Sequence, residues 1–66
     1  MRVCVNGEAR SLGQGATLAD LIGILGLKPR RIAVERNQRI VRRARYARTL
    51  LADDDKIEIV TLVGGG

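Results

Sequence analysis

The chain has 66 residues, of which 45% are hydrophobic, and twelve Lys and Arg against seven Asp and Glu give it a formal net charge of +5. This length suffices for one small domain, because two separate pieces could not each bury enough surface to fold. The single cysteine, Cys4, excludes an internal disulfide, and no apolar run approaches the length of a membrane span. We therefore expect one soluble domain, residues 1–66, in a reducing cytoplasm and without a membrane partner.

The first twelve residues predict a β-hairpin. Val3 and Val5 alternate with polar neighbours, which is typical of a half-buried strand. The dipeptide Asn6-Gly7 suits the positive φ values of a two-residue turn, so a second strand should return through residues 8–12. Residues 13–15, Gly-Gln-Gly, then end the hairpin.

A helix is predicted to begin at Thr17. Its hydroxyl can accept a hydrogen bond from a free backbone N–H, and Asp20 follows three residues later, as in a capping box. Apolar residues at helical spacing form one stripe for the core, namely Leu18, Leu21, Ile22 and Leu25. Gly26 is placed for a left-handed C-terminal residue, and Pro29 prevents the helix from continuing.

The second half of the chain predicts further strands and no second regular helix. The expected segments are a strand at 31–35, a turn at 37–38, a short strand at 40–41, and a last strand at 56–63. Residues 42–49 show no regular period, and the three aspartates at 53–55 are interpreted as a solvated turn.

These elements predict an α+β fold with two layers. The single main helix must bury its apolar stripe against one face of a mixed sheet of four to five strands. Which strands lie side by side cannot be read from the sequence, so the order of the strands stays open at this point.

The last strand carries more apolar residues than one covered face requires. Alternation places Ile57 and Ile59 on one face, and Val60 and Leu62 on the other. Isolated exposed apolar residues are common, so they can be incidental. Because the excess directly precedes three glycines, we predict instead a partner-docking patch formed by Val60, Leu62 and Val63.

The glycines 64–66 allow three interpretations: a frayed end, a cloning remnant, or a reactive tail. Such a tail is expected to be flexible and reaches about 10 Å when extended. Gly64 and Gly65 could thread a channel too narrow for a Cβ, and the Gly66 carboxylate could attack the α-phosphate of ATP to form an acyl-adenylate. The resulting hypothesis makes this protein the substrate of other catalysts.

The sequence contains no catalytic machinery of its own that we can identify. It has no histidine, no Gly-rich phosphate loop and no cluster of metal ligands. We therefore predict a protein that is not an enzyme, with no catalytic residue, no bound cofactor and no metal site.

Nine of the twelve basic residues fall between Lys28 and Arg48. This concentration raises the possibility of nucleic-acid binding. Tyr46 is the only aromatic residue, and no zinc ligands or recognition-helix motif accompany the charge, so nucleic acid is not expected as a partner. Surface charge, or steering towards an acidic protein partner, is the preferred interpretation.

Four segments together resemble the sulfur carrier protein of thiamine biosynthesis, the ThiS family. They are VNGE in the first turn, GATLADLI at the helix start, RIAVERNQRIV in the middle strands, and DDKIEIVTLVGGG at the end. The resemblance implies a β-grasp, ubiquitin-like fold. It also implies that Gly66 is adenylated by an E1-like, ThiF-like enzyme that uses ATP and Mg²⁺. A cysteine-derived donor would then supply sulfur for a thiocarboxylate, which serves a ThiG-like thiazole synthase.

One departure and two alternatives accompany this resemblance. Many family members are similar to I-V-P-R where this chain has Ile40-Val41-Arg42-Arg43, so the conformation of this connection is not implied. A carrier similar to the small subunit of molybdopterin synthase would share the fold and the Gly-Gly end. A ubiquitin-like modifier joined to lysines through Gly66 is the other alternative.

Overall fold

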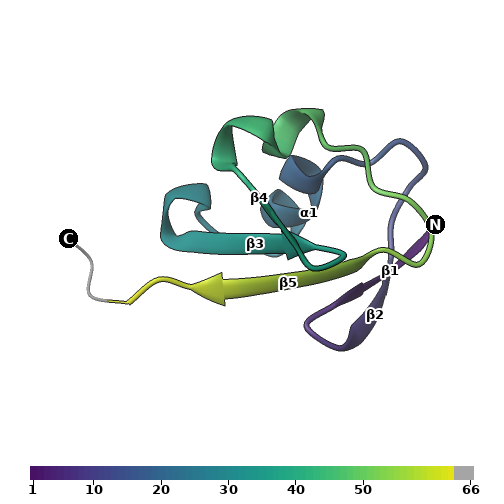
Figure 1. Ribbon diagram of the computed structural model, residues 1–66. Helices are drawn as coiled ribbons and strands as arrows, with labels where there is room; N and C mark the ends of the chain where they lie inside the picture. Colours follow the sequence, from purple (N-terminus) through teal and green to yellow (C-terminus); the bar gives the residue numbers. More distant parts are fainter. Residues whose placement is uncertain (64–66) are drawn as a thin grey trace.

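The computed structural model describes residues 1–63 and consists of one sheet with helical segments on one side (Figure 1). The strands are β1 (Arg2–Val5), β2 (Glu8–Ser11), β3 (Ile32–Arg36), β4 (Arg39–Val41) and β5 (Lys56–Thr61). The helical segments are α1 (Leu18–Ile24) and two 3₁₀ helices, η1 (Pro29–Arg31) and η2 (Arg43–Arg48). In residues 1–63, no helix has the length and apolar character needed to cross a membrane.

The first and last strands are neighbours at the centre of the sheet. The strand order is β2-β1-β5-β3-β4, and β1 runs parallel to β5, with Val5 opposite Ile57. The other pairs, β1 with β2, β3 with β5 and β3 with β4, are antiparallel. This central adjacency, which periodicity left open, agrees with the fold that the family resemblance implies.

The N-terminal hairpin forms as predicted. Asn6 and Gly7 have φ values of 49° and 83°, so the tight turn uses the left-handed region in which Asn and Gly are tolerated best. The second strand is one residue shorter than expected. Leu12, just beyond it, is buried in the core.

Helix α1 begins and ends for the reasons that its sequence indicates. The Asp20 backbone N–H donates to the Thr17 hydroxyl at 3.1 Å, and the Thr17 N–H donates to the Asp20 carboxylate at 2.9 Å, which completes a capping box. Leu18, Leu21 and Ile22 are buried, as predicted. Gly26 has φ 71°, the left-handed conformation expected at the end of a helix.

The core lies between the sheet and the helical layer and is almost entirely aliphatic. Its twelve buried apolar residues include alternate positions of β1, β3 and β5, the apolar stripe of α1, and Leu51. Tyr46 on η2 contributes the one aromatic ring and is 5% exposed. Burial raises the pKa of the Tyr46 phenol, and the nearby Arg43 charge partly offsets that rise.

Three expectations need correction. Residues 43–48, predicted to be irregular, form η2, because a 3₁₀ turn lets Tyr46 reach the core while its polar neighbours stay in solvent. Strand β5 ends at Thr61 rather than at residue 63, since no strand partner continues beyond Ile32. The turn at 53–55 is not fully solvated: Asp55 is 6% exposed.

Candidate functional site

The end of β5 presents apolar side chains to solvent. Along this strand Ile57 and Ile59 are buried, whereas Val60 is 59% exposed. Beyond the strand, Leu62 and Val63 are 52% and 96% exposed. The predicted exposure of Val60 and Leu62 is therefore confirmed, while the role of Val60, Leu62 and Val63 in docking a partner stays a prediction.

Backbone pairing with β3 and the residue before it fixes the chain as far as Leu62. Thr61 lies opposite Ile32 in the β3–β5 ladder, and the Leu62 N–H donates to the Arg31 carbonyl at 2.7 Å. The predicted threading residues Gly64 and Gly65 and the predicted reactive Gly66 lie outside the described residues.

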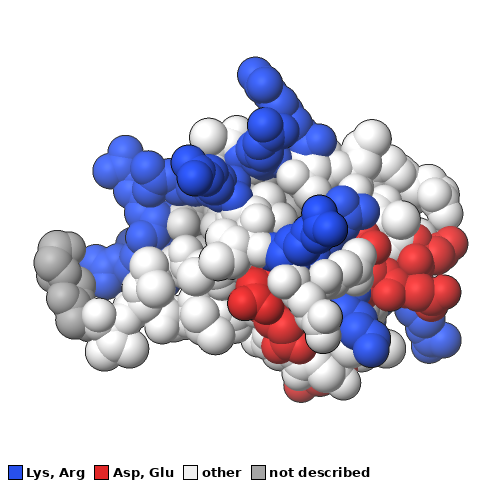
Figure 2. Space-filling view, in the orientation of Figure 1, with Lys and Arg blue, Asp and Glu red and all other residues white. Residues whose placement is uncertain are grey.

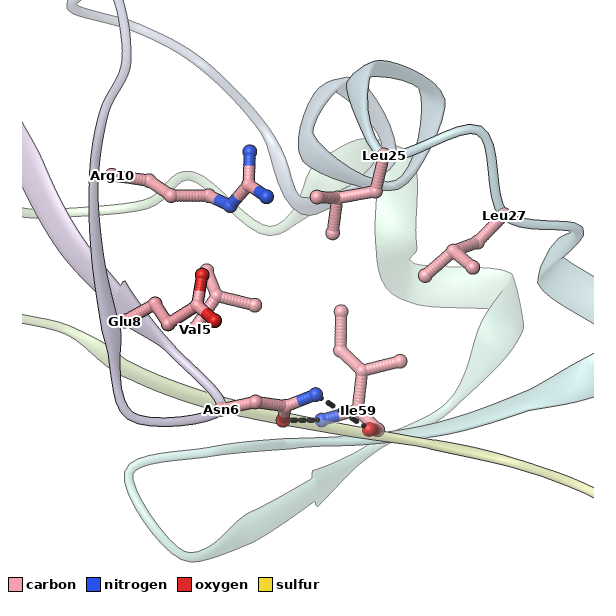
Figure 3. A pocket seen from close by; sticks show the side chains of 7 residues that line it. All are labelled: Val5, Asn6, Glu8, Arg10, Leu25, Leu27 and Ile59. Atoms are coloured by element: carbon pink, nitrogen blue, oxygen red, sulfur yellow. Dashed lines mark hydrogen bonds between the residues drawn. The ribbon is translucent and has the colours of Figure 1, made fainter.

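Asn6 attaches the N-terminal hairpin to β5 (Figure 3). Its side-chain amide donates to the Ile59 carbonyl at 3.0 Å and accepts from the Ile59 N–H at 2.7 Å. The Asn6 side chain thereby satisfies both the N–H and the carbonyl of Ile59, which lies in the central strand β5. The contact lies two residues before the end of β5, so it helps to define where the strand leaves the domain.

A hollow of about 240 Å³ lies beside this contact, between β2 and the end of α1. Figure 3 shows Leu25 and Leu27 facing Val5 and Ile59 across it, with charged side chains from β2 at one side. Those side chains are Glu8 and Arg10. The residues that line the hollow include no nucleophile with an adjacent base, so this lining does not indicate covalent catalysis.

Asp55 holds the loop before β5 against the β3–β4 turn. Its carboxylate accepts hydrogen bonds from Arg36 Nε at 2.8 Å, Asn37 Nδ2 at 3.0 Å and the Ala52 N–H at 2.8 Å. Burial alone would raise the pKa of Asp55, but these three donors and the Arg36 charge together lower it below its usual value. The acidic turn therefore has a structural function: it fixes the start of the central strand.

Within residues 1–63 no group of three His, Cys, Asp or Glu side chains is placed to hold a metal ion.

The basic segment forms a surface of its own. Figure 2 shows Lys and Arg side chains gathered along the upper and left margin, over the helical layer, and acidic side chains at the right beside the N-terminus. Part of this surface is a hollow of about 330 Å³ beside β4, lined by Arg36, Arg39, Arg42 and Arg45 together with Ile40, Val41 and Thr49. Its charge suits long-range attraction of an acidic surface.

Sequence reasoning missed two features of the open sheet face, which is the face turned away from α1. Ile40 is 77% exposed, and Glu35 lies directly opposite Glu58 in the β3–β5 ladder. Alternation within each strand could have placed these side chains on the outer face. Their proximity depends on the register between strands, which periodicity does not contain.

A sheet with parallel first and last strands at its centre and one main helix across one face defines the β-grasp class of ubiquitin-like proteins. The crystal structure of a thiamine biosynthesis protein (ThiS) from Geobacter metallireducens is similar over 100% of both chains, with a TM-score of 0.85 and 25% identity. A sequence profile of the ThiS family matches residues 3–66. The chain belongs to the ThiS family.

The relatives include a protein of similar length and two much longer proteins. The sulfur carrier protein ThiS of Bacillus subtilis is 44% identical over 50 residues, which cover 76% of each chain. Thiazole synthases of Paramagnetospirillum magneticum and Magnetococcus marinus are 44% and 42% identical over all 66 residues. These 66 residues span only a fifth of the length of either thiazole synthase.

Proposed function

We propose that this protein is a sulfur carrier in thiamine biosynthesis and that the Gly66 carboxylate carries the sulfur. Membership of the ThiS family and similarity to the Bacillus subtilis sulfur carrier support this function. The single structural observation that carries it is the exit of the chain from the central strand, with exposed apolar side chains at Val60, Leu62 and Val63, which directly precede glycines 64–66 in the sequence.

The proposed chemistry has two steps, both catalysed by partner proteins. A Gly66 carboxylate oxygen attacks the α-phosphorus of ATP, pyrophosphate leaves, and an acyl-adenylate forms in an E1-like, ThiF-like enzyme that binds Mg²⁺. A hydrosulfide equivalent from a cysteine-derived donor then attacks the acyl carbon and displaces AMP. The product is a thiocarboxylate, and the carrier itself supplies neither a base nor a metal site.

The sulfur acceptor in this proposal is a ThiG-like thiazole synthase. Two thiazole synthases contain a segment similar to this whole chain, which supports a functional connection between the two kinds of domain. Such a connection requires that the carrier release the activating enzyme before it meets the synthase, because both need the same glycine tail.

The glycines have a physical role in this proposal. Gly64 and Gly65 have no Cβ, so an extended tail of about 10 Å can enter a channel that a larger residue would block. The chemistry further requires a free carboxylate at Gly66 in the mature protein. Intact-mass measurement of the purified protein establishes that terminus directly.

The proposal is tested by co-expressing the chain with the activating enzyme and sulfur donor of the same organism. We expect the intact mass to gain the difference between one sulfur and one oxygen, located on Gly66. A matched variant without Gly65 and Gly66 should keep the circular-dichroism spectrum of the full chain and gain no sulfur. An unchanged mass for the full chain, or a gain that persists after the deletion, would contradict the proposal.

The same samples distinguish a ubiquitin-like modifier. That alternative predicts isopeptide adducts between Gly66 and lysines of other proteins, in place of a free thiocarboxylate. Tryptic peptides that carry residues 57–66 of this chain on a lysine of another protein would reassign the function, because Lys56 is the last basic residue before Gly66.

A further inference from the structure

Four arginines line the hollow of about 330 Å³ beside β4, and no acidic residue lines it. They are Arg36, Arg39, Arg42 and Arg45. Between residues 1 and 63 the only salt bridge joins Arg36 and Asp55, so the other three arginines have no acidic partner in that part of the chain. The hollow therefore gathers positive charge that the described domain does not neutralise.

The hollow lies at the corner where β4 leads into η2. Arg39 and Val41 share one face of β4, because alternate residues of a strand point to the same side. Val41 packs against the core, so this face is the one covered by the helical layer. Arg45 belongs to η2, which follows β4 on the same side of the sheet as α1 (Figure 1). Arginines from two different elements are thus brought to one place by the fold.

A tight turn holds two of these arginines at fixed positions. Arg36 and Arg39 lie directly opposite each other in the β3–β4 ladder, and the two residues between them, Asn37 and Gln38, have φ values of 52° and 70°. Arg36 Nε donates to the Asp55 carboxylate at 2.8 Å, which uses one of the five N–H donors of this guanidinium. Directly opposed like charges disfavour the folded state, and a bound anion would remove that repulsion.

We propose that this arginine hollow binds a small anion with two or more linked phosphate groups. A guanidinium presents a planar fork of donors that matches the oxygens of a phosphate, and such charge-assisted hydrogen bonds are about twice as strong as neutral ones. Linked phosphates carry several charges within a few bonds, which suits several arginines around one hollow. The volume is near the lower end of small-ligand sites, roughly 300–1,000 Å³, so the ligand should be compact.

Two other anionic ligands fit the hollow less well. Single-stranded nucleic acid is commonly bound through aromatic side chains that stack on its bases, but Tyr46 is the only aromatic residue and is 5% exposed. An extended acidic protein segment places the carboxylates of one face about 7 Å apart. It therefore brings fewer charges to one hollow than a phosphate chain of the same length.

This inference goes beyond the proposed carrier function and does not depend on it. The arginine hollow contains no residue of the glycine tail, so the variant without Gly65 and Gly66 should bind the anion as tightly as the full chain. A failure of sulfur transfer would leave the anion site intact, and a failure of anion binding would leave the carrier function intact.

The test is calorimetric binding of inorganic tripolyphosphate to the full chain, in physiological salt and without Mg²⁺. We expect tripolyphosphate to bind at least about tenfold more tightly than orthophosphate at the same ionic strength. Arg39→Gln/Arg45→Gln should raise the dissociation constant for tripolyphosphate at least about tenfold. The matched control Arg2→Gln/Arg10→Gln removes the same charge at two exposed arginines outside the hollow, and its constant should change less than about threefold.

Two further measurements locate the site and check the fold. Backbone amide NMR signals of residues 39–45 should shift on addition of tripolyphosphate. Urea unfolding should show that Arg39→Gln/Arg45→Gln is at least as stable as the parent chain, because Arg39 no longer opposes Arg36. ATP carries the same three linked phosphates: equal binding of ATP and tripolyphosphate supports a site for the phosphate chain alone, and tighter binding of ATP supports a nucleotide site.

Four results would overturn the inference. They are no binding of tripolyphosphate by the parent chain, equal affinity for orthophosphate, equal weakening by Arg2→Gln/Arg10→Gln, and tighter binding of a glutamate-rich peptide or a single-stranded RNA than of tripolyphosphate. Equal weakening by the control would show that only the net charge of the chain matters. Tighter binding of the peptide or of the RNA would assign the hollow to a macromolecule of that class.

Discussion

The side-chain amide of Asn6 forms both hydrogen bonds that a neighbouring backbone would form with Ile59, although 53 positions separate the two residues. Asn6 also has φ 49°, a conformation that Asn tolerates better than most residues. One residue thus closes the first turn and extends the contact between β1 and β5.

Replacing Asn6 separates these two contributions. Asn6→Gly keeps the left-handed backbone but removes both hydrogen bonds, so we expect a loss of about 1–2 kcal/mol in the free energy of unfolding. Asn6→Ala should lose about 1 kcal/mol more, because its Cβ opposes the positive φ. Urea unfolding measures both values. A glycine variant as stable as the parent chain would show that the amide contacts contribute nothing.

The lowered pKa of Asp55 predicts a pH dependence of stability. A carboxylate with a lower pKa in the folded state stabilises the fold fully above its unfolded pKa of about 3.9. That contribution disappears as the pH falls through the lower folded-state value. Asp55→Asn should therefore lose about 1–3 kcal/mol at neutral pH, and its difference from the parent chain should shrink in acid. Asp54→Asn, at an exposed neighbour, is the control; a constant difference at all pH values would contradict the prediction.

The capping box at the start of α1 predicts a modest local effect. Thr17→Ala removes the acceptor for the Asp20 N–H, and we expect a loss of about 1 kcal/mol. Thr17→Ser keeps a hydroxyl at the cap and should stay within a few tenths of a kcal/mol of the parent chain. Thermal unfolding followed at a helix-sensitive wavelength distinguishes the two. Equal losses for Ala and Ser would indicate that the Thr17 methyl group, and not its hydroxyl, matters.

Tyr46 tests whether η2 is part of the core. Tyr46→Ala should cost about 3–5 kcal/mol, because it empties the space filled by a ring that is 5% exposed. Tyr46→Phe keeps the buried ring and removes only the hydroxyl, so it should change stability by less than about 1 kcal/mol. Chemical denaturation of both variants provides the measurement. A mild effect of Tyr46→Ala would show that η2 packs loosely.

Local patterns predicted most of the individual elements. Asn6-Gly7, the capping box at Thr17 and the C-terminal Gly26 each depend on backbone geometry within a few residues, and all three are present as expected. The two-residue alternation of side chains in a strand also identified the buried positions of β1, β3 and β5. Such signals depend on a few neighbouring residues, so they can be recognised without knowledge of the rest of the fold.

Sequence patterns predict the segment at 42–55 less well than the other elements. Its 3₁₀ helix has too few residues for a periodic signal, and burial of Tyr46 follows from where η2 lies over the sheet. Three adjacent aspartates normally favour solvent. Asp55 is an exception, because hydrogen-bond donors from the β3–β4 turn, far away in the sequence, bind its carboxylate. The sequence carries no local sign of those donors.

By itself, the sequence determined a small α+β domain with one aliphatic core, one capped helix, and an apolar last strand that leads into glycines. Only the tertiary structure decided that β1 and β5 pair at the centre, that Asn6 holds Ile59, and that Glu35 faces Glu58 across an uncovered face. The physical reason is that the period of a strand fixes which of its side chains share a face. The choice and register of its neighbours depend on contacts between residues distant in the chain.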